Sequence, residues 1–181
     1  DICLFDRTGQ RLISCHRQDV VSYKIPDTVT CIGKSAFEGY HSLESSEIPD
    51  SVICIEDDAF GYCDSLNASD IPSRVAVIGN GVFYHCNALK NIAADCVETI
   101  GDDAFYGCES LQDFIIPNTV TTIGRSAFGG CKSLRSIHFP QSVAGIGDGV
   151  FVNSDLSVTT ASPRFFSAGV CLFDKIQQRL I

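Results

Sequence analysis

The stretch "IPNTVTTIGRSAFGGCKSLRSIHFPQSVAGIGDGVF", residues 116–151, contains one short pattern nearly twice. Ile-Gly, a small residue and Phe recur after a fixed interval, and Pro and Val precede them at matching distances. Outward from this stretch, an Ala-Phe or Val-Phe pair stands at 36–37, 59–60, 82–83, 104–105, 127–128 and 150–151. The spacings are 23, 23, 22, 23 and 23 residues, so the chain repeats one unit six times.

Other residue types keep the same frame along the chain. Ile recurs at 32, 55, 78, 100, 123 and 146, Val at 29, 52, 75, 97, 120 and 143, and Leu at 43, 66, 89, 111 and 134. Cys stands at 63, 86, 108 and 131, with Tyr40 and Ser154 in the two outer copies. A period of roughly 20–29 residues with this Leu pattern is typical of leucine-rich repeats. A single coil cannot bury its own apolar face, so the pattern predicts stacked coils in which each residue type forms a column.

Within one copy, "SLRSIHFP" (133–140) predicts a short strand with Leu134, Ile137 and Phe139 pointing inward. Pro140 ends this strand because it has no N–H for the ladder. The residues before the Ala/Val-Phe pairs are all of types favoured at a helix N-cap: Ser35, Asp58, Gly81, Asp103, Ser126 and Gly149. A single helical turn is therefore expected after each of them.

The fold class that follows is a repeat solenoid, a right-handed leucine-rich-repeat superhelix about 25–30 Å long. We expect a parallel β-sheet of short strands on its concave face and single helical turns elsewhere. Residues 25–163 hold the six repeats, 1–24 an N-terminal hairpin segment, and 164–181 the start of a second one. The third strand, "ALKNIAADCV" (88–97), lacks the Pro and has Ala94 in place of Ile, which predicts a local dent.

The two ends of the chain copy each other. "CLFDRTGQRLISCHR" (3–17) and "CLFDKIQQRLI" (171–181) each predict a two-stranded hairpin with a polar turn. One interpretation makes them two caps that shield the ends of the solenoid. The favoured interpretation is a larger repeat, in which hairpin and six-coil array alternate along a longer parent protein.

Composition excludes several functions. Net charge is −9 and the pI near 4.7, which argues against nucleic-acid binding, since that needs a clustered basic surface. The same acidity favours a soluble monomer. The longest apolar runs fall far short of the roughly 20 residues that span a bilayer, so no direct membrane insertion is expected from this segment.

Two stretches carry a family resemblance: "IPDTVTCIGKSAFEGYHSL" (25–43) and "VETIGDDAFYGCESLQDFIIPNTVTTIGRSAFGGCKSLRSIHFP" (97–140). They resemble BspA-like leucine-rich repeats, and the "LFDRTGQRLI" hairpin is similar to the segment that introduces such arrays. The resemblance implies an extracellular or cell-surface location and adhesion to a protein or glycan of a host or neighbouring cell. It implies no catalytic residue and no cofactor.

The ten cysteines raise the question of disulfides or a metal site. The column of Cys63, Cys86, Cys108 and Cys131 is expected to consist of buried free thiols that act as small hydrophobic residues. Cys31 and Cys54 lie one repeat apart, within disulfide reach but with side-by-side geometry that suits the bond poorly, and their oxidation state stays open. Cys3, Cys15, Cys96 and Cys171 show no obvious partner. The four His residues (16, 41, 85, 138) share no repeat position with a ligand set, so no metal site is expected.

Catalytic and calcium sites find little support in the pattern. Asp57-Asp58, Asp102-Asp103 and Asp148 recur at one turn, as a calcium spine would require, but the alternate copies carry Lys34, Asn80 and Arg125 there. Capping of the turn suits this alternation better. His85 and Cys86 are adjacent and should point to opposite sides, and no Gly-x-Ser-x-Gly or P-loop occurs. The sequence therefore predicts a non-enzymatic protein.

The remaining candidate site is the outward side of the predicted strands, where residues are not needed for stacking and do vary. These ten residues are Ser45, Glu47, Ala68, Asp70, Asn91, Ala93, Asp113, Ile115, Ser136 and His138. Solenoids commonly bind partners on such a face, and Ile115 beside His138 is the best candidate for a contact. The alternatives are a passive solvated face and a structural spacer in a larger surface protein. "NAS" (67–69) makes Asn67 a possible glycosylation site.

Overall fold

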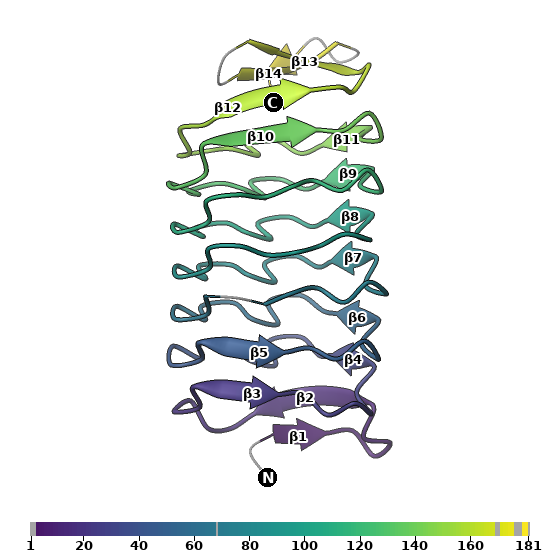
Figure 1. Ribbon diagram of the computed structural model, residues 1–181, viewed down its shortest axis with the longest axis vertical. Helices are drawn as coiled ribbons and strands as arrows, with labels where there is room; N and C mark the ends of the chain where they lie inside the picture. The colour runs from purple at the N-terminus through teal and green to yellow at the C-terminus, as the bar shows by residue number, and fades with distance from the viewer. Residues whose placement is uncertain (1–2, 68, 169–170, 176–178, 181) are drawn as a thin grey trace.

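The structure is a computed structural model that describes residues 3–67, 69–168, 171–175 and 179–180. Its coils stack along the long axis, with the N-terminus at one end and the C-terminus at the other (Figure 1). Each coil contains a two-residue strand, a tight turn, and a longer extended segment that leads into the next coil. This is the repeat solenoid that the sequence predicts.

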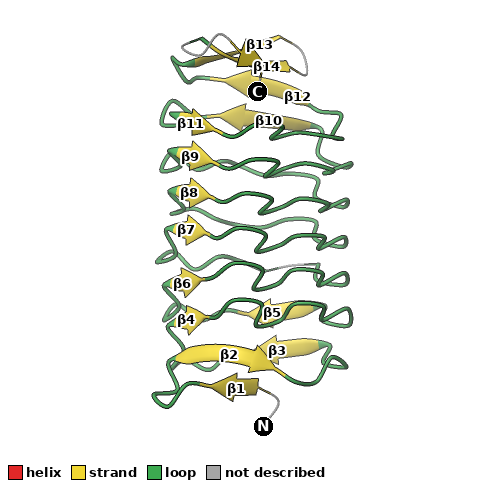
Figure 2. Ribbon diagram, turned by 180° about the vertical axis from the view of Figure 1, so that it is seen from behind, coloured by secondary structure: helices red, strands yellow, loops and turns green. Residues whose placement is uncertain are grey.

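One continuous sheet of eight strands runs along the side of the stack (Figure 2). Its strands are β1 (Cys3–Phe5), β2 (Arg11–Cys15), β4 (Cys31–Ile32), β6 (Cys54–Ile55), β7 (Val77–Ile78), β8 (Thr99–Ile100), β9 (Thr122–Ile123) and β11 (Gly145–Ile146). All neighbours except β1 and β2 are parallel, and equivalent repeat positions pair, so that Ile32 lies beside Ile55 and Ile55 beside Ile78. The repeat period therefore sets the register.

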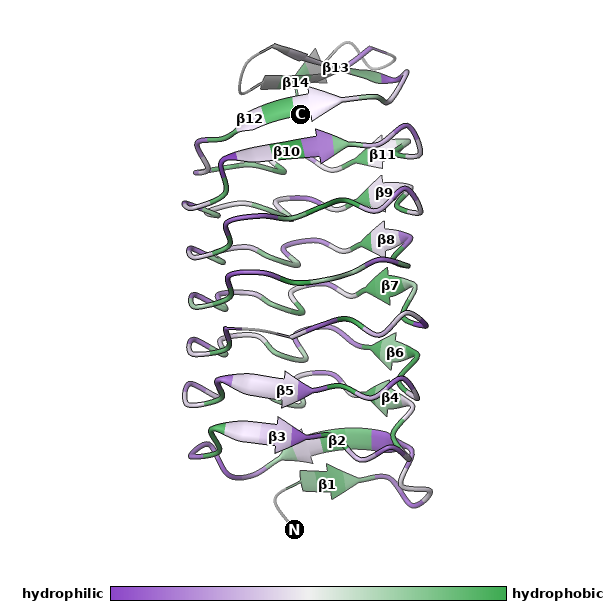
Figure 3. Cartoon of the chain, in the orientation of Figure 1, coloured by the Kyte–Doolittle hydropathy of each residue, from purple (hydrophilic) through white to green (hydrophobic). Residues whose placement is uncertain are grey.

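The predicted strands form the opposite limb of each coil, which we call the variable face: residues 45–47, 69–70, 91–93, 113–115 and 136–138. Among the described residues of this face, regular strand pairs occur only toward its two ends, where β3 (Ser22–Lys24) pairs with β5 (Ser45–Glu47) and β10 (Ser136–Phe139) with β12 (Ser157–Thr160). Between these pairs the segments run extended and are linked by single main-chain bonds such as Lys90 N–H to Asn67 O (3.4 Å). In Figure 3 the strands β3 and β5 are hydrophilic, whereas β6 and β7 are hydrophobic.

The core is a stack of aromatic rings. Phe37, Phe60, Phe83, Phe105 and Phe128 follow one another at centroid distances of 5.1, 5.7, 5.5 and 5.4 Å, with ring planes within 8° of parallel. None of them is more than 1% exposed. Phe151 continues the stack at 6.4 Å from Phe128 and is only half-buried. The predicted Phe column is confirmed.

The cysteine column is buried as predicted, but its thiols also make hydrogen bonds. Each thiol points at the main-chain oxygen of Phe in the preceding coil, with sulfur–oxygen distances of 3.1 Å for Cys63, Cys86 and Cys108 and 3.3 Å for Cys131. Ser154 takes the same place in the last coil and donates to Phe128 O at 2.9 Å. Burial raises the pKa of Cys63 and of Cys131 to about 12, so these thiols stay protonated and can donate.

The predicted helical turns are wrong: none of the described residues is helical (Figure 2). The residues expected to be N-caps have left-handed backbone instead, for example Ser35 (φ 55°) and Asp58 (φ 57°). Main-chain N–H groups alternate along the turn, so that Phe37 donates to Ala59 O in the next coil whereas Ala36 donates to Gly33 O. Ser, Asp and Gly suit both situations, because short polar residues and glycine tolerate left-handed backbone as well as N-cap positions.

The N-terminal hairpin is part of the stack. Its strand β2 pairs in parallel with β4, so Leu12 lies beside Ile32 and fills the place of a repeat Ile. Cys3 and Cys15 face each other across β1 and β2 with a Cα–Cα distance of 3.9 Å and form a disulfide. The sequence shows no obvious partner for these two cysteines, and the structure pairs them with each other. Their pairing follows from the register of the hairpin, which the spacing of the cysteines alone does not reveal.

The C-terminal segment forms a three-stranded antiparallel sheet of β13 (Phe165–Ala168), β14 (Cys171–Asp174) and β15 (Arg179–Leu180). Arg164 holds it to the last coil: its Nη1 donates to Ala144 O at 2.5 Å, and its Nη2 lies 2.6 Å from the buried Oδ2 of Asp174. No helix long and apolar enough to cross a bilayer occurs in the part of the chain that the structure describes.

Candidate functional site

The candidate residues lie on the outer side of the variable face. Eight of them are exposed: Glu47, Asp70, Asn91, Ala93, Asp113, Ile115, Ser136 and His138. Ser45 is half-buried, and Ala68 lies outside the described residues. Asn67, the possible glycosylation site, is exposed at the start of the second segment. Their orientation follows from extended backbone, in which alternate side chains point to opposite sides and the intervening Ile92, Phe114 and Ile137 are buried.

Ile115 is the most exposed large apolar residue of the face, at 86%. A hollow of about 320 Å³ lies on one side of it, lined by Asp70, Asn91, Ile92, Ala93, Ala94, Asp95 and Asp113. This hollow coincides with the third segment, where the small Ala94 predicts a dent. A second hollow, of about 240 Å³, lies on the other side and includes Ser136 and His138. The isolated side chain therefore stands between two depressions.

Charge is unevenly spread over this face. Glu47, Asp70 and Asp113 give acidic character to the earlier coils, and Lys24 approaches Glu47 at 3.8 Å. His138 lies in the later part, with Nδ1 2.9 Å from Thr159 Oγ1. Acidic side chains thus extend from the first segment of the face to the fourth, where Asp113 lies two residues from Ile115.

Two of the recurring turn carboxylates, those of Asp57 and Asp102, accept hydrogen bonds from main chain. Asp57 Oδ1 accepts from Asn80 N–H at 2.8 Å, Asn80 Oδ1 accepts from Asp102 N–H at 2.8 Å, and Asp102 Oδ1 accepts from Arg125 N–H at 2.7 Å. Each side chain therefore caps a main-chain donor of the next coil. The ladder thus uses one side-chain oxygen of each of these residues for capping.

The adjacent His85 and Cys86 point apart. Cys86 is fully buried in the thiol column, whereas His85 is half-buried and its ring stacks on that of Tyr62 at 5.6 Å. Burial raises the pKa of Cys86 well above its usual value. His85 therefore does not activate the Cys86 thiol as a nucleophile.

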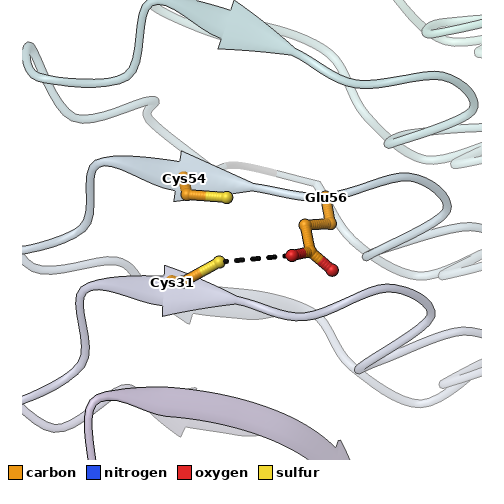
Figure 4. Close-up of side chains that lie close together, drawn as sticks. All are labelled: Cys31, Cys54 and Glu56. Atoms are coloured by element: carbon orange, nitrogen blue, oxygen red, sulfur yellow. Dashed lines mark hydrogen bonds between the residues drawn. The ribbon is translucent and has the colours of Figure 1, made fainter.

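Cys31, Cys54 and Glu56 come together on the side of the continuous sheet (Figure 4). Their two sulfurs and a carboxylate oxygen lie within 4.8 Å of one another, and both thiols are free. Arg11 binds both carboxylate oxygens of Glu56, and its Nη1 lies 3.5 Å from Cys31 Sγ. Burial, with further contributions from Cys54 and Glu56, raises the pKa of Cys31 to about 12. The Arg11 guanidinium therefore already binds both oxygens of the Glu56 carboxylate, which a metal ion would need as ligands.

Sequence reasoning missed this cluster, although a signal for it exists. Glu56 stands at a repeat position that holds glycine in all five remaining copies: Gly33, Gly79, Gly101, Gly124 and Gly147. Its carboxylate also accepts from Lys34 N–H at 3.0 Å, so it fastens three coils together. A charged residue in a glycine column indicates a specific partner, here Arg11 of the hairpin.

Replacement of Glu56 by glutamine is expected to lower the free energy of unfolding at pH 7 by about 0.5–1 kcal/mol, a discounted value because both side chains are about a third exposed. The bond from Arg11 lowers the pKa of Glu56 below its ordinary 4.5. The stability that the ionised Glu56 carboxylate contributes is therefore fully present above pH 4.5. It is lost as the pH falls through the lower pKa of Glu56 in the folded state. Urea unfolding from pH 7 to 3 should show a smaller loss of stability on acidification for the variant. Glu109→Gln, at the more exposed pair with Lys132, should follow the parent protein.

Comparison with known proteins agrees with this architecture. The sequence profile described as "BspA type Leucine rich repeat region (6 copies)" matches residues 14–97 and 98–178. No curated protein matches the chain by sequence.

Three solved structures show a similar fold. A leucine-rich repeat protein of Eubacterium ventriosum is 22% identical over 84% of this chain and 48% of its own, with a TM-score of 0.67. The T. pallidum leucine-rich repeat protein is 24% identical over 88% and 83%, with a TM-score of 0.71. The pneumococcal vaccine antigen PcpA is 22% identical over 95% and 37%, with a TM-score of 0.53. The chain spans about half the length of the Eubacterium structure. Six coils in register and a profile match across most of the sequence show that the chain belongs to the BspA-type leucine-rich-repeat family.

Proposed function

We propose that the chain is a non-enzymatic binding module of a cell-surface or secreted protein, and that it adheres to a host matrix protein or another cell through the variable face. The exposed Ile115 between two hollows is the observation that carries this proposal. An isolated apolar side chain with depressions on either side can enter a partner's surface and be buried there, as central residues of protein interfaces are.

The repeat explains why this face is available for binding. Inward positions are fixed by the columns of Phe, Ile, Leu and Cys, whereas outward positions of the variable face can change without loss of stacking. The family resemblance supports a surface location and an adhesive role. A glycan partner and a protein partner both fit an open, partly acidic face.

The test compares variants of this face with a matched variant of the other sheet. Asp70→Ala, Ile115→Ala and His138→Ala are measured one by one for binding to immobilised extracellular-matrix extract and to intact epithelial cells. Val77→Ala is the control, because Val77 is a 52% exposed aliphatic residue on the continuous sheet. We expect Ile115→Ala to weaken binding about tenfold and Val77→Ala to leave it unchanged.

A structural spacer is the second candidate. The continuous sheet and the ring stack make the solenoid a single elongated unit that could separate other parts of a longer protein. If Asp70→Ala, Ile115→Ala and His138→Ala all leave binding unchanged, the result would favour the spacer function. Because each coil contacts only its neighbours, such a rod should tolerate surface changes throughout.

A further inference from the structure

A second unusual surface lies in the turns between the short strands and the variable face. We call it the aromatic platform: Tyr62, Tyr84, His85 and Tyr106. Tyr62 stacks on His85 at 5.6 Å with planes 4° apart, and Tyr84 stacks on Tyr106 at 5.4 Å and 14°. The two stacks meet edge to face, with 4.6 Å between the centroids of Tyr84 and His85. Tyr62 is 43% exposed and the other three are half-buried, so ring surface reaches solvent.

The platform interrupts the repeat. At the position of Tyr62 and His85 the other copies carry Gly39, Gly107, Gly130 and Asn153. At the position of Tyr84 and Tyr106 they carry Glu38, Gly61, Gly129 and Val152. The neighbouring glycines make room for the rings: a Cβ on Gly107 would lie 2.6 Å from His85 Nδ1, and one on Gly129 would lie 2.7 Å from Tyr106 Cδ2. Aromatic residues are thus confined to three successive coils.

Stacking of the coils does not require these rings, and the backbone disfavours two of them. Tyr62 (φ 58°) and His85 (φ 54°) have left-handed backbone, which glycine adopts freely and bulky residues rarely do. The copies that hold Gly39, Gly107 and Gly130 show that the coil closes without a side chain here. Residues held in unfavourable backbone conformations gather at functional sites, where the side chain is needed in that place.

Carboxylates border the platform. Asp58 and Asp103 occupy equivalent positions two coils apart. At Gly81 between them a Cβ would collide with Asp58 Oδ1 and lie 3.7 Å from Tyr84 Cβ, so the Asp58 carboxylate lies close to Tyr84. Their ion pairs, with Lys34 and Arg125, are long at 4.0 Å, and the Asp side chains are 42% and 34% exposed. Burial raises the pKa of Tyr84, and the other platform tyrosines and Asp103 add to this effect. The net charge of −9 gives the surroundings the same sign.

We propose that the aromatic platform binds a basic segment of a partner protein. An Arg or Lys side chain of that segment lies against the rings of Tyr84 and Tyr106, with its charge next to Asp103. Ring faces attract cations, and tyrosine supplies large, rigid contact area at protein interfaces. The site is independent of the variable face, so either surface can bind while the other is altered.

The probe for the test is a hexa-arginine peptide, and its neutral isostere, hexa-citrulline, is the matched control. The chain has no Trp, and three of its five Tyr lie in the platform, so tyrosine ring signals in NMR spectra report binding directly. Hexa-arginine is expected to shift the ring signals of Tyr84 and Tyr106, whereas hexa-citrulline is not. Raising the salt concentration should weaken binding but keep the same signals affected.

Variants of the platform and of the variable face separate ring contacts from charge. Tyr84→Leu with Tyr106→Leu keeps the charge and should raise the dissociation constant about tenfold, because each exposed ring contributes modestly to cation binding. The double variant Ile115→Ala/His138→Ala on the variable face should leave the dissociation constant for the peptide unchanged. Tyr62→Asn introduces the residue type that Asn153 has in the same left-handed backbone (φ 59°), so we expect this variant to keep the coil while it removes one platform ring.

The results that would overturn the proposal are specific. Equal affinity of the parent and the Tyr84→Leu/Tyr106→Leu variant would show that charge alone attracts the peptide. Equal binding of hexa-citrulline would remove the need for a cation. Preferential binding of a neutral oligosaccharide such as cellohexaose, with the same ring signals shifted, would assign the platform to glycans instead.

Discussion

Phe83→Ala is expected to lower the free energy of unfolding by about 4 kcal/mol, the largest effect of any single substitution considered. Phe83 is fully buried, and its ring lies between those of Phe60 at 5.7 Å and Phe105 at 5.5 Å. Truncation removes two ring contacts and leaves a cavity that neighbouring coils cannot close without losing register. Urea unfolding followed by circular dichroism measures the change.

The control for this prediction is the end of the same column. Phe151 is half-buried, and its nearest rings are Phe139 at 5.7 Å and Phe128 at 6.4 Å. Phe151→Ala should lower stability by about half as much as Phe83→Ala, because the site is partly solvated. Equal effects at the two positions, or a loss below about 1 kcal/mol at Phe83, would contradict a continuous ring stack.

Gly101→Ala is expected to destabilise the protein by about 3 kcal/mol through overpacking. A Cβ at this position would lie 2.7 Å from the carbonyl carbon of Gly79 and 2.8 Å from the main-chain nitrogen of Asn80. These atoms belong to the backbone of the preceding coil, so the two coils would have to separate. Thermal and urea unfolding measure the loss.

Gly145→Ala is the matched control, since Gly145 lies in β11 of the continuous sheet and Gly101 directly follows β8 of the same sheet. Its Cβ would meet only the Thr122 side chain, at 3.5 Å or more, which is ordinary contact. This variant should keep the stability of the parent within about 1 kcal/mol. If Gly101→Ala were tolerated as well as Gly145→Ala, the close approach of the coils would be wrong.

The columns of the core could be predicted because they depend only on period. A spacing of 23 residues puts Phe60 above Phe37 whatever the details of the turn, and the alternation around Ile137 sets which strand residues are buried. The left-handed turns could not be predicted in the same way. Ser35 and Asp58 are residue types that satisfy both an N-cap and a left-handed position, so the sequence leaves the choice to the hydrogen bonds between coils.

Features that depend on contacts between different columns were also missed. The Cys3–Cys15 disulfide requires the hairpin register, and the ion pair of Arg11 with Glu56 requires the hairpin to lie on the first coils. The ion pair could have been suspected from a departure from the repeat, because Glu56 stands in a glycine column. The aromatic platform is a departure of the same kind. Residues that break a column are therefore the most informative ones for function in this chain.

The central claim is that equivalent side chains of successive coils lie directly on one another. A nuclear Overhauser spectrum of the assigned phenylalanine ring protons tests it most directly. The account predicts cross-peaks between Phe60 and Phe83, whose centroids are 5.7 Å apart, and none between Phe37 and Phe105, which are three coils apart. Absence of the Phe60–Phe83 cross-peak, or a direct cross-peak between Phe37 and Phe105, would contradict it.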